Sequence, residues 1–325
     1  MKVLRISAVA AMLACCCTIH TSASAEQFPS RAVKFLVPQA AGGATDVFAR
    51  KLAQMLSERW GQPIIVENRA GAAGVLGTDV VAKSAADGYT LLVTYAGSQA
   101  VNPSLYPNLP FDSVTDFQPI ATLARTPFLL VVNPKIPAKD LREFIALARR
   151  KPGILTFASS GIGSVNHLLG EMLKVQAGIN ILHVPYRGVA PAIADVIARH
   201  VDSAFSSVPS VLGNIGGGQV RALAVSSAKR VAVAPDVPTI AESGFPGFDV
   251  NPWWGILAPA RTDTAVVRRI NRDVNELLQD KDLIDFLATQ GAEPFATSPE
   301  EFLAILKSDV EKWAKVIKAA DVKLN

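Results

Sequence analysis

The sequence has little cysteine, and all of it lies near the N-terminus. Its three cysteines are Cys15, Cys16 and Cys17 in a chain of 325 residues. Beyond Cys17 there is no thiol to form a disulfide, attack a substrate or bind a metal. A chain of this length can bury a large hydrophobic core without disulfides.

Charge of one sign is also lacking. Charged residues make up 18% of the chain, and 32 Lys+Arg are nearly balanced by 28 Asp+Glu. There is no basic block with interleaved aromatic residues, so the sequence gives no reason to expect a nucleic-acid partner.

Long apolar runs are missing after the N-terminus. A short positive region at Lys2 and Arg5 precedes a mostly apolar stretch that ends at Ile19, and the small residues Ala23-Ser24-Ala25 follow. That apolar stretch is shorter than the roughly 20 residues of a membrane span. We therefore predict a signal peptide over residues 1–25, cleaved near Ala25, and a periplasmic mature chain.

Two alternatives concern the same segment. It could stay uncleaved as an anchor, or Cys15 could carry a lipid after a poor lipobox, Met12-Leu13-Ala14-Cys15. Removal of residues 1–25 leaves 300 residues, which is enough for two ordinary domains or one large one.

Short apolar runs alternate with helical patterns along the chain. The runs are rich in Val, Ile, Leu and Phe without strict alternation, which is typical of strands covered on both faces. The predicted strands are Val33–Val37, Ile64–Glu67, Thr90–Tyr95, Phe128–Val132, Leu155–Ala158, Ile181–Val184, Val201–Phe205 and Ala222–Val225. Alternation of strands and helices on this scale predicts an α/β fold.

Helices are predicted between these strands. One begins after Thr45 and another after Ser164, which is the predicted N-cap. A third opens with the capping box Ser298-Pro299-Glu300-Glu301 and runs towards Val316.

Two Pro- and Gly-rich stretches, Arg125–Pro127 and Phe245–Pro252, are the candidate crossovers between domains. They predict one lobe made of residues 26–126 and 250–325, and a second lobe made of residues 127–249. Two crossing strands form a hinge, which suits a protein that closes on a ligand.

The loop after the first strand is the most informative segment. In Val37–Asp46, two glycines and several small residues separate a buried strand from a helix. The first turn of a helix has N–H groups without internal partners, and glycines allow close approach to them. The loop can therefore seat an anion, although packing alone also explains many glycine-rich turns.

A second loop of the same kind spans Ala158–His167, where three hydroxyls meet a helix N-terminus. Two such loops on separate α/β units can face each other across a cleft and hold a ligand with two polar ends. A third glycine-rich turn, Gly71–Gly77, is expected to serve packing.

Other chemistry is poorly supported. Gly161-Ile162-Gly163 lacks the rest of a dinucleotide fingerprint, and Gly213 and Gly218 lack the Lys-Ser/Thr of a P-loop. There is no G-x-S-x-G or H-E-x-x-H sequence. We expect no cofactor, no metal and no enzymatic activity. A hydrolase that uses Ser159, Ser160 or Ser164 is kept as an alternative, because triad partners can be distant in sequence.

Two further features each have two possible roles. His167 could pair with Glu171 one helical turn later, and isolated histidines of this kind are more often structural than catalytic. The Trp253-Trp254 pair could wall a pocket or pack in the core or hinge.

Several ordered sequences together resemble the Bug-type receptors of the tripartite tricarboxylate transporter family, over nearly all of the chain after residue 25. Besides the two loops, they include Asn102-Pro103-Ser104-Leu105-Tyr106, His183-Val184-Pro185-Tyr186-Arg187-Gly188, Val201-Asp202, Arg221-Ala222-Leu223-Ala224-Val225 and Pro235-Asp236-Val237-Pro238-Thr239.

The resemblance implies a two-lobed, Venus-flytrap periplasmic-binding-protein fold with a ligand cleft between the lobes. It implies that backbone amides and waters of the first loop hold a carboxylate, while the second loop closes on the other end of the ligand. The residues placed at the ligand by this resemblance are Gln39, Gly43, Ala44, Thr45, Asp46, Ser98, Ser159, Ser164, Asn166, Tyr186, Asp202 and Phe205.

Two positions depart from the family pattern. Gln39 replaces an aromatic or small residue, and Ala198-Arg199-His200 replaces a glycine-rich stretch. Asp46 has two open roles: it can accept from an amino or hydroxyl group of the ligand, or complement the helix dipole.

The resemblance predicts a monomeric receptor that delivers a di- or tricarboxylate, an amino acid or an aromatic acid to membrane transporter subunits. A receptor that signals to a membrane sensor kinase is the alternative output.

Overall fold

The computed structural model describes residues 28–324. The predicted signal peptide, its cleavage site and Cys15 lie outside these residues. Within residues 28–324, no helix is both long and apolar enough to cross a bilayer.

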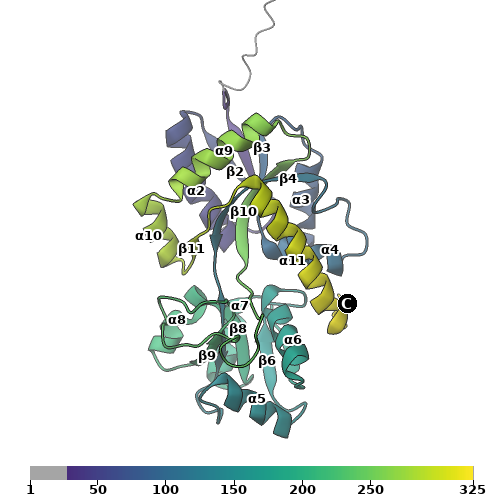
Figure 1. Cartoon of the computed structure of the whole chain (residues 1–325), viewed down its shortest axis with the longest axis vertical. Coiled ribbons are helices and arrows are strands. Elements are labelled where there is room, and N and C mark those ends of the chain that lie inside the picture. Colours follow the sequence, from purple (N-terminus) through teal and green to yellow (C-terminus); the bar gives the residue numbers. More distant parts are fainter. Residues whose placement is uncertain (1–27, 325) are drawn as a thin grey trace, which may run out of the picture.

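The chain forms two α/β lobes, each built on its own sheet (Figure 1). The first sheet has the order β11-β4-β10-β3-β1-β2. Its strands are β1 (Val33–Val37), β2 (Ile64–Asn68), β3 (Thr90–Tyr95), β4 (Phe117–Arg125), β10 (Trp253–Pro259) and β11 (Glu293–Pro294). The second sheet has the order β7-β6-β8-β5-β9. Its strands are β5 (Phe128–Val132), β6 (Thr156–Ser159), β7 (Leu182–Pro185), β8 (Ser203–Ser207) and β9 (Arg221–Val225).

Helices cover both sheets. Those of the first lobe are α2 (Ala44–Trp60), α3 (Val75–Ala82), α4 (Asn102–Leu105), α9 (Thr264–Leu277), α10 (Lys281–Thr289) and α11 (Pro299–Ala319), with short helical turns at Ala72–Gly74 and Gly97–Val101. Those of the second lobe are α5 (Leu141–Arg150), α6 (Val165–Ala177), α7 (Val189–Ala198) and α8 (Val208–Gly216).

All eight predicted strands are present, with ends shifted by no more than two residues. β4, β10 and β11 were not predicted. β10 and β5 differ from their neighbours in direction: β10 runs antiparallel to β3 and β4, and β5 runs antiparallel to β8 and β9. The reason is connectivity, because the chain enters each sheet from the other lobe at these strands.

The helix N-termini follow the sequence signals. Ser164 Oγ accepts from His167 N–H at the start of α6, and Ser298 and Glu301 form the reciprocal capping box of α11. α11 continues to Ala319, beyond the expected Val316, and reaches across to α6 of the second lobe (Figure 1).

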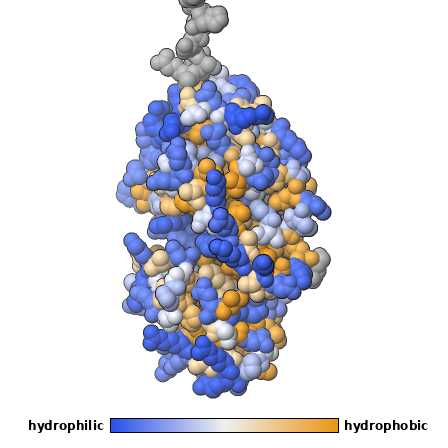
Figure 2. Space-filling view, turned by 45° about the vertical axis from the view of Figure 1, so that its right-hand side comes forward, coloured by the Kyte–Doolittle hydropathy of each residue, from blue (hydrophilic) through white to orange (hydrophobic). Residues whose placement is uncertain are grey.

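One hydrophobic core cluster runs through both lobes. It joins Leu36 and Leu92 of the first sheet to Leu130 and Phe157 of the second. On the face shown in Figure 2, hydrophilic residues are spread over both lobes, and hydrophobic residues gather in smaller patches. The lobes are thus joined through a buried interior and by two strand connections.

Candidate functional site

Strand register shows which loops face the junction between the lobes. β10 and β4 reach the junction where Trp253 pairs with Arg125, and Tyr95 at the end of β3 lies opposite Trp254. β1 is parallel to β3 and ends at the same side. The carboxyl ends of β1 and β3 therefore point towards the second lobe.

The second lobe presents its strands in the same way. Phe128 at the start of β5 pairs with Ser207 at the end of β8, and β6 is parallel to β8. The loops that follow β6 and β8 therefore point towards the first lobe. This places the two predicted anion loops at facing ends of the two sheets.

The first loop presents an uncapped helix N-terminus. Gly43 is the N-cap of α2 and has no side chain to bond the first N–H groups of the helix. Gly42 has φ +83°, a conformation that favours glycine, and residues 40–44 are exposed. N–H groups in the first turn have no helical acceptor, so those of Ala44 and Thr45 are available to an anion.

Asp46 holds this loop rather than facing an open space. Its Oδ2 accepts from Gly42 N–H at 2.8 Å and from Arg50 Nε at 3.0 Å, and its side chain is 4% exposed. Burial raises the pKa of Asp46, but hydrogen bonds from Arg50 and Gly42 outweigh it and hold the pKa below its ordinary value. The geometry therefore favours the loop-holding role of Asp46 over direct contact with a ligand.

Three other predicted residues of the first lobe are joined to its framework. Thr45 Oγ1 accepts from Trp254 Nε1 at 3.1 Å. Gln39 Nε2 donates to Ser98 Oγ at 2.8 Å, and Ser98 Oγ donates to the carbonyl of Ala73. Gln39 Oε1 is buried without a hydrogen-bond partner among the described residues. Gln39 and Ser98 thus meet next to the glycine-rich turn at residues 71–77.

The second loop is fixed by its own side chains. Ser159 Oγ accepts from Gly161 N–H at 3.1 Å, and Ser164 Oγ donates to the carbonyl of Gly161 at 2.7 Å. Asn166 accepts from Ser160 and donates to the carbonyl of Phe205, both at 2.8 Å. Ser159, Ser164 and Asn166 therefore belong to one connected loop.

Three predicted residues lie apart from that loop or serve other contacts. The Phe205 side chain belongs to the core. Tyr186 donates to Asp195 at 2.6 Å, and burial together with Asp195 raises its pKa to about 12. Asp202 precedes β8 and accepts from Thr156 N–H and Oγ, at the end of the strand away from the junction.

Ser159 and His183 lie close enough to raise the hydrolase alternative. Ser159 Oγ is 2.6 Å from His183 Nε2. A triad needs a carboxylate on the other ring nitrogen, and no such hydrogen bond to His183 Nδ1 occurs within residues 28–324. Ser159 is also only 1% exposed, which leaves little room for attack on a substrate.

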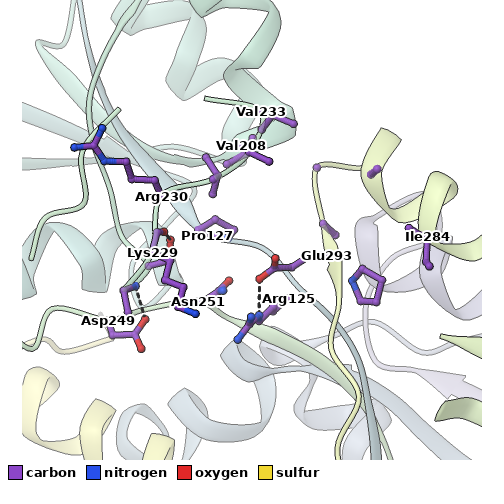
Figure 3. Close-up of a pocket in the computed structure, with 18 residues that line it drawn as sticks. Arg125, Pro127, Val208, Lys229, Arg230, Val233, Asp249, Asn251, Ile284 and Glu293 are labelled. Carbon is purple, nitrogen blue, oxygen red and sulfur yellow. Dashed lines mark hydrogen bonds and ion pairs between the residues drawn. The ribbon is translucent and has the colours of Figure 1, made fainter. Parts of the chain in front are cut away.

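A cavity of about 570 Å³ lies elsewhere between the lobes (Figure 3). One wall comes from Ile284, Ala288 and residues 291–294, and another from residues 227–233. Of its charged groups, Arg125 pairs with Glu293 and Asp249 accepts from Ala228 N–H, while the Lys229 ammonium has no such partner among residues 28–324. None of the twelve residues predicted from the sequence lines it.

Sequence reasoning missed the site contacts of two residues, one of which, Trp254, it weighed only as a pocket wall or as packing. Trp254 bonds Thr45, and His183 bonds Ser159. The first contact joins β10 to the start of α2 and the second joins β7 to β6, and the sequence displays neither of these long-range contacts. Within residues 28–324, no group of three or more His, Cys, Asp or Glu could hold a metal ion.

The family model "Tripartite tricarboxylate transporter family receptor" matches residues 48–322. The chain is 39% identical to Protein BugT of Bordetella pertussis over 325 residues, the whole of both chains.

Solved structures agree. The structure of R. palustris Rpa4515 with adipate has a TM-score of 0.79 and 35% identity, covering 91% of this chain and 99% of the other. MatC from Rhodopseudomonas palustris with bound malate has a TM-score of 0.75 and 32% identity, covering 89% and 100%. The fold is that of periplasmic binding proteins, and the family consists of solute receptors rather than enzymes. The chain belongs to the tripartite tricarboxylate transporter family of receptors.

Proposed function

We propose that this receptor binds a small organic acid by a carboxylate at the first loop and delivers it to the membrane subunits of a tripartite tricarboxylate-type transporter. The observation that carries the proposal is the N-terminus of α2, which faces the junction with exposed residues and no side-chain cap. A carboxylate there would accept from main-chain N–H groups and gain from the helix dipole.

The other end of the ligand would meet the second loop around Ser159–Asn166. Its hydroxyls and amide are held by hydrogen bonds within the loop, so their positions are set before a ligand arrives. Adipate and malate, named with two relatives, each carry a carboxylate at both ends. This supports a dicarboxylate as the ligand class for this chain.

Closure would be a rotation about the two connections. We place the lobe boundaries at residues 126–127 and 249–250, where the chain passes between the sheets. A ligand that touches both loops favours the closed form because it binds that form more tightly. Residues 1–25 would direct export and would then be removed by cleavage near Ala25.

The substitution Ala44→Pro tests the carboxylate seat at its main-chain donor. Ala44 is the first residue of α2, where proline is tolerated, and Gly43 has the extended conformation that suits a residue before proline. The substitution removes one N–H and leaves the helix intact. Losing one hydrogen bond to a charged group should weaken binding of adipate and malate about tenfold or more.

Thr264→Pro is the matched control. Thr264 is the exposed first residue of α9, far along the chain from both loops. It should bind both acids as the unsubstituted protein does. Equal affinities for Ala44→Pro and the control, measured by calorimetry, would contradict the proposed seat.

A further inference from the structure

Two histidine rings are stacked directly behind the second loop. His167 lies on α6 and His183 on β7, and their ring centroids are 3.8 Å apart with planes inclined by 15°. Phe157 of β6 packs against both rings, at 6.3 Å from His167 and 5.0 Å from His183. His167 is 5% exposed and His183 is partly buried, so the stack lies largely inside the lobe.

Each ring is bonded to a different point of the loop. His183 Nε2 is 2.6 Å from Ser159 Oγ, which in turn accepts from Gly161 N–H. His167 Nδ1 accepts from Gly163 N–H at 3.1 Å. The histidine pair therefore anchors the beginning and the end of the turn at residues 159–163.

The anchored turn touches the first lobe. Gly163 has φ +77°, and a Cβ there would lie 2.4 Å from Leu105 Cδ1. The loop backbone is thus packed closely against a side chain of the opposite lobe. A small shift of this turn would alter the surface that meets the first lobe and any ligand between the lobes.

The charged groups around the rings fix one protonation pattern. Glu171 Oε1 is 3.6 Å from His167 Nε2, and Lys174 is paired with Glu171 at 2.8 Å. Since His167 Nδ1 accepts from Gly163, its proton is assigned to Nε2, on the side of Glu171. A proton added at Nδ1 would remove the only acceptor that this ring offers to the loop.

We propose that His167 and His183 are positioning residues of the second ligand loop, which hold the turn at residues 159–163 in its binding conformation only while both rings are neutral. The inference rests on the proposed function, in which this loop meets the ligand. Two charged rings at 3.8 Å would repel, and a charged His167 would turn a donor towards Gly163 N–H. Acid should therefore loosen the loop and weaken binding.

The electrostatics of His183 agree with this proposal. Burial, followed by the neighbouring His167, lowers the pKa of His183 to about 4. Its ring is thus neutral at the pH at which an unperturbed histidine begins to charge. Of the nearby groups, Glu171 acts in the opposite direction and Lys174 in the same direction as His167.

The first test measures affinity for adipate and malate between pH 4 and pH 8 with His167→Gln and His183→Gln. The control is His200→Gln, whose side chain is 71% exposed and pairs with Asp195 away from the stack. The Kd of each variant is divided by the Kd of the unsubstituted protein at the same pH, so that the effect of ligand protonation cancels. We expect about tenfold weaker binding at pH 7 for the two stack variants and a ratio near one for the control.

The expected ratio for His183→Gln falls towards one only as the pH approaches 4, where His183 itself becomes charged and the unsubstituted loop loses this anchor. Ratios near one at every pH would overturn the proposal. Binding of neither acid by the unsubstituted protein would count against the proposed function instead.

A second measurement needs no ligand. Amide exchange of Gly163 should be protected at pH 7 in the unsubstituted protein and in His200→Gln, and should be at least about tenfold faster in His167→Gln. Unchanged protection of Gly163 in folded His167→Gln would also overturn the proposal.

Discussion

Substitution of Asp46 separates the loop-holding role that the structure favours from direct contact with the ligand. The carboxylate accepts from the N–H of Gly42 and from Arg50. A hydrogen bond to a charged group contributes about 1.5–3 kcal/mol, but Gly42 is exposed and water can replace part of its bond. Arg50 is 53% exposed, which reduces the ion pair to roughly 0.5 kcal/mol. Asp46→Ala should therefore cost about 2 kcal/mol and lower Tm by about 5 °C.

The measurement combines thermal unfolding with calorimetric binding of adipate and malate. Asp46→Asn keeps an acceptor for Gly42 and should lose about half as much stability. If Asp46 holds the loop, Asp46→Ala weakens the binding of both acids by a similar factor. If Asp46 contacts the ligand directly, the substitution lowers the affinity for malate, which carries a hydroxyl, more than the affinity for adipate.

One result would refute the loop-holding role altogether. It is an Asp46→Ala protein that unfolds within about 1 °C of the unsubstituted chain and binds both acids equally well. Arg50→Gln serves as the control for the ion pair alone, and only a small loss is expected from it.

Three further predictions follow from the described contacts. His183 has a folded-state pKa of about 4, below its ordinary value of 6.5, so its contribution to stability is full above pH 6.5 and is lost as the pH falls towards 4. In urea unfolding between these pH values, the free energy of unfolding of His183→Gln should depend less on pH than that of the unsubstituted protein. The same pH profile in both proteins would contradict this. Arg199 ends α7 in the left-handed conformation with φ +66°, so Arg199→Gly should raise the free energy of unfolding by about 0.5 kcal/mol. Gly178 ends α6 with φ +58°, so Gly178→Ala should lower it by about 1 kcal/mol. Changes of the opposite sign would argue against left-handed conformations at these two helix ends. A Cβ on Gly77 would lie 2.6 Å from the carbonyl oxygen of Arg69, so Gly77→Ala should lower Tm by several degrees, and a neutral effect would show that this turn does not need glycine for packing.

Local patterns carried most of the fold. The predicted runs at Val33–Val37, Thr90–Tyr95 and Phe128–Val132 coincide with β1, β3 and β5. β4 was missed because Gln118, Pro119 and Thr122 interrupt its apolar character, although it is mostly buried. The pairing that makes β10 central to the first sheet joins residues more than a hundred positions apart and leaves no local signal.

The site was predictable in outline and less so in detail. Helix-start signals located both loops, because glycine and serine before an amphipathic run have local physical causes. Contacts such as Ser159 with His183 depend on the β6–β7 pairing. Asp202 precedes β8, and the direction of this strand places it at the end away from the junction between the lobes. Although Asp202 is only three residues from Phe205 in the sequence, this does not reveal at which end of β8 it lies.

The central claim is that main-chain N–H groups at the first loop hold a carboxylate. Calorimetric titration of ligand-free protein with adipate and with its uncharged diamide tests this most directly, because the two compounds have the same chain length. The account predicts that adipate binds and raises Tm. At a hundredfold excess over its Kd, adipate should stabilise the folded protein by roughly 2.7 kcal/mol. The diamide should bind at least tenfold more weakly. Equal binding of acid and diamide, or binding of neither adipate nor any other carboxylate, would contradict it.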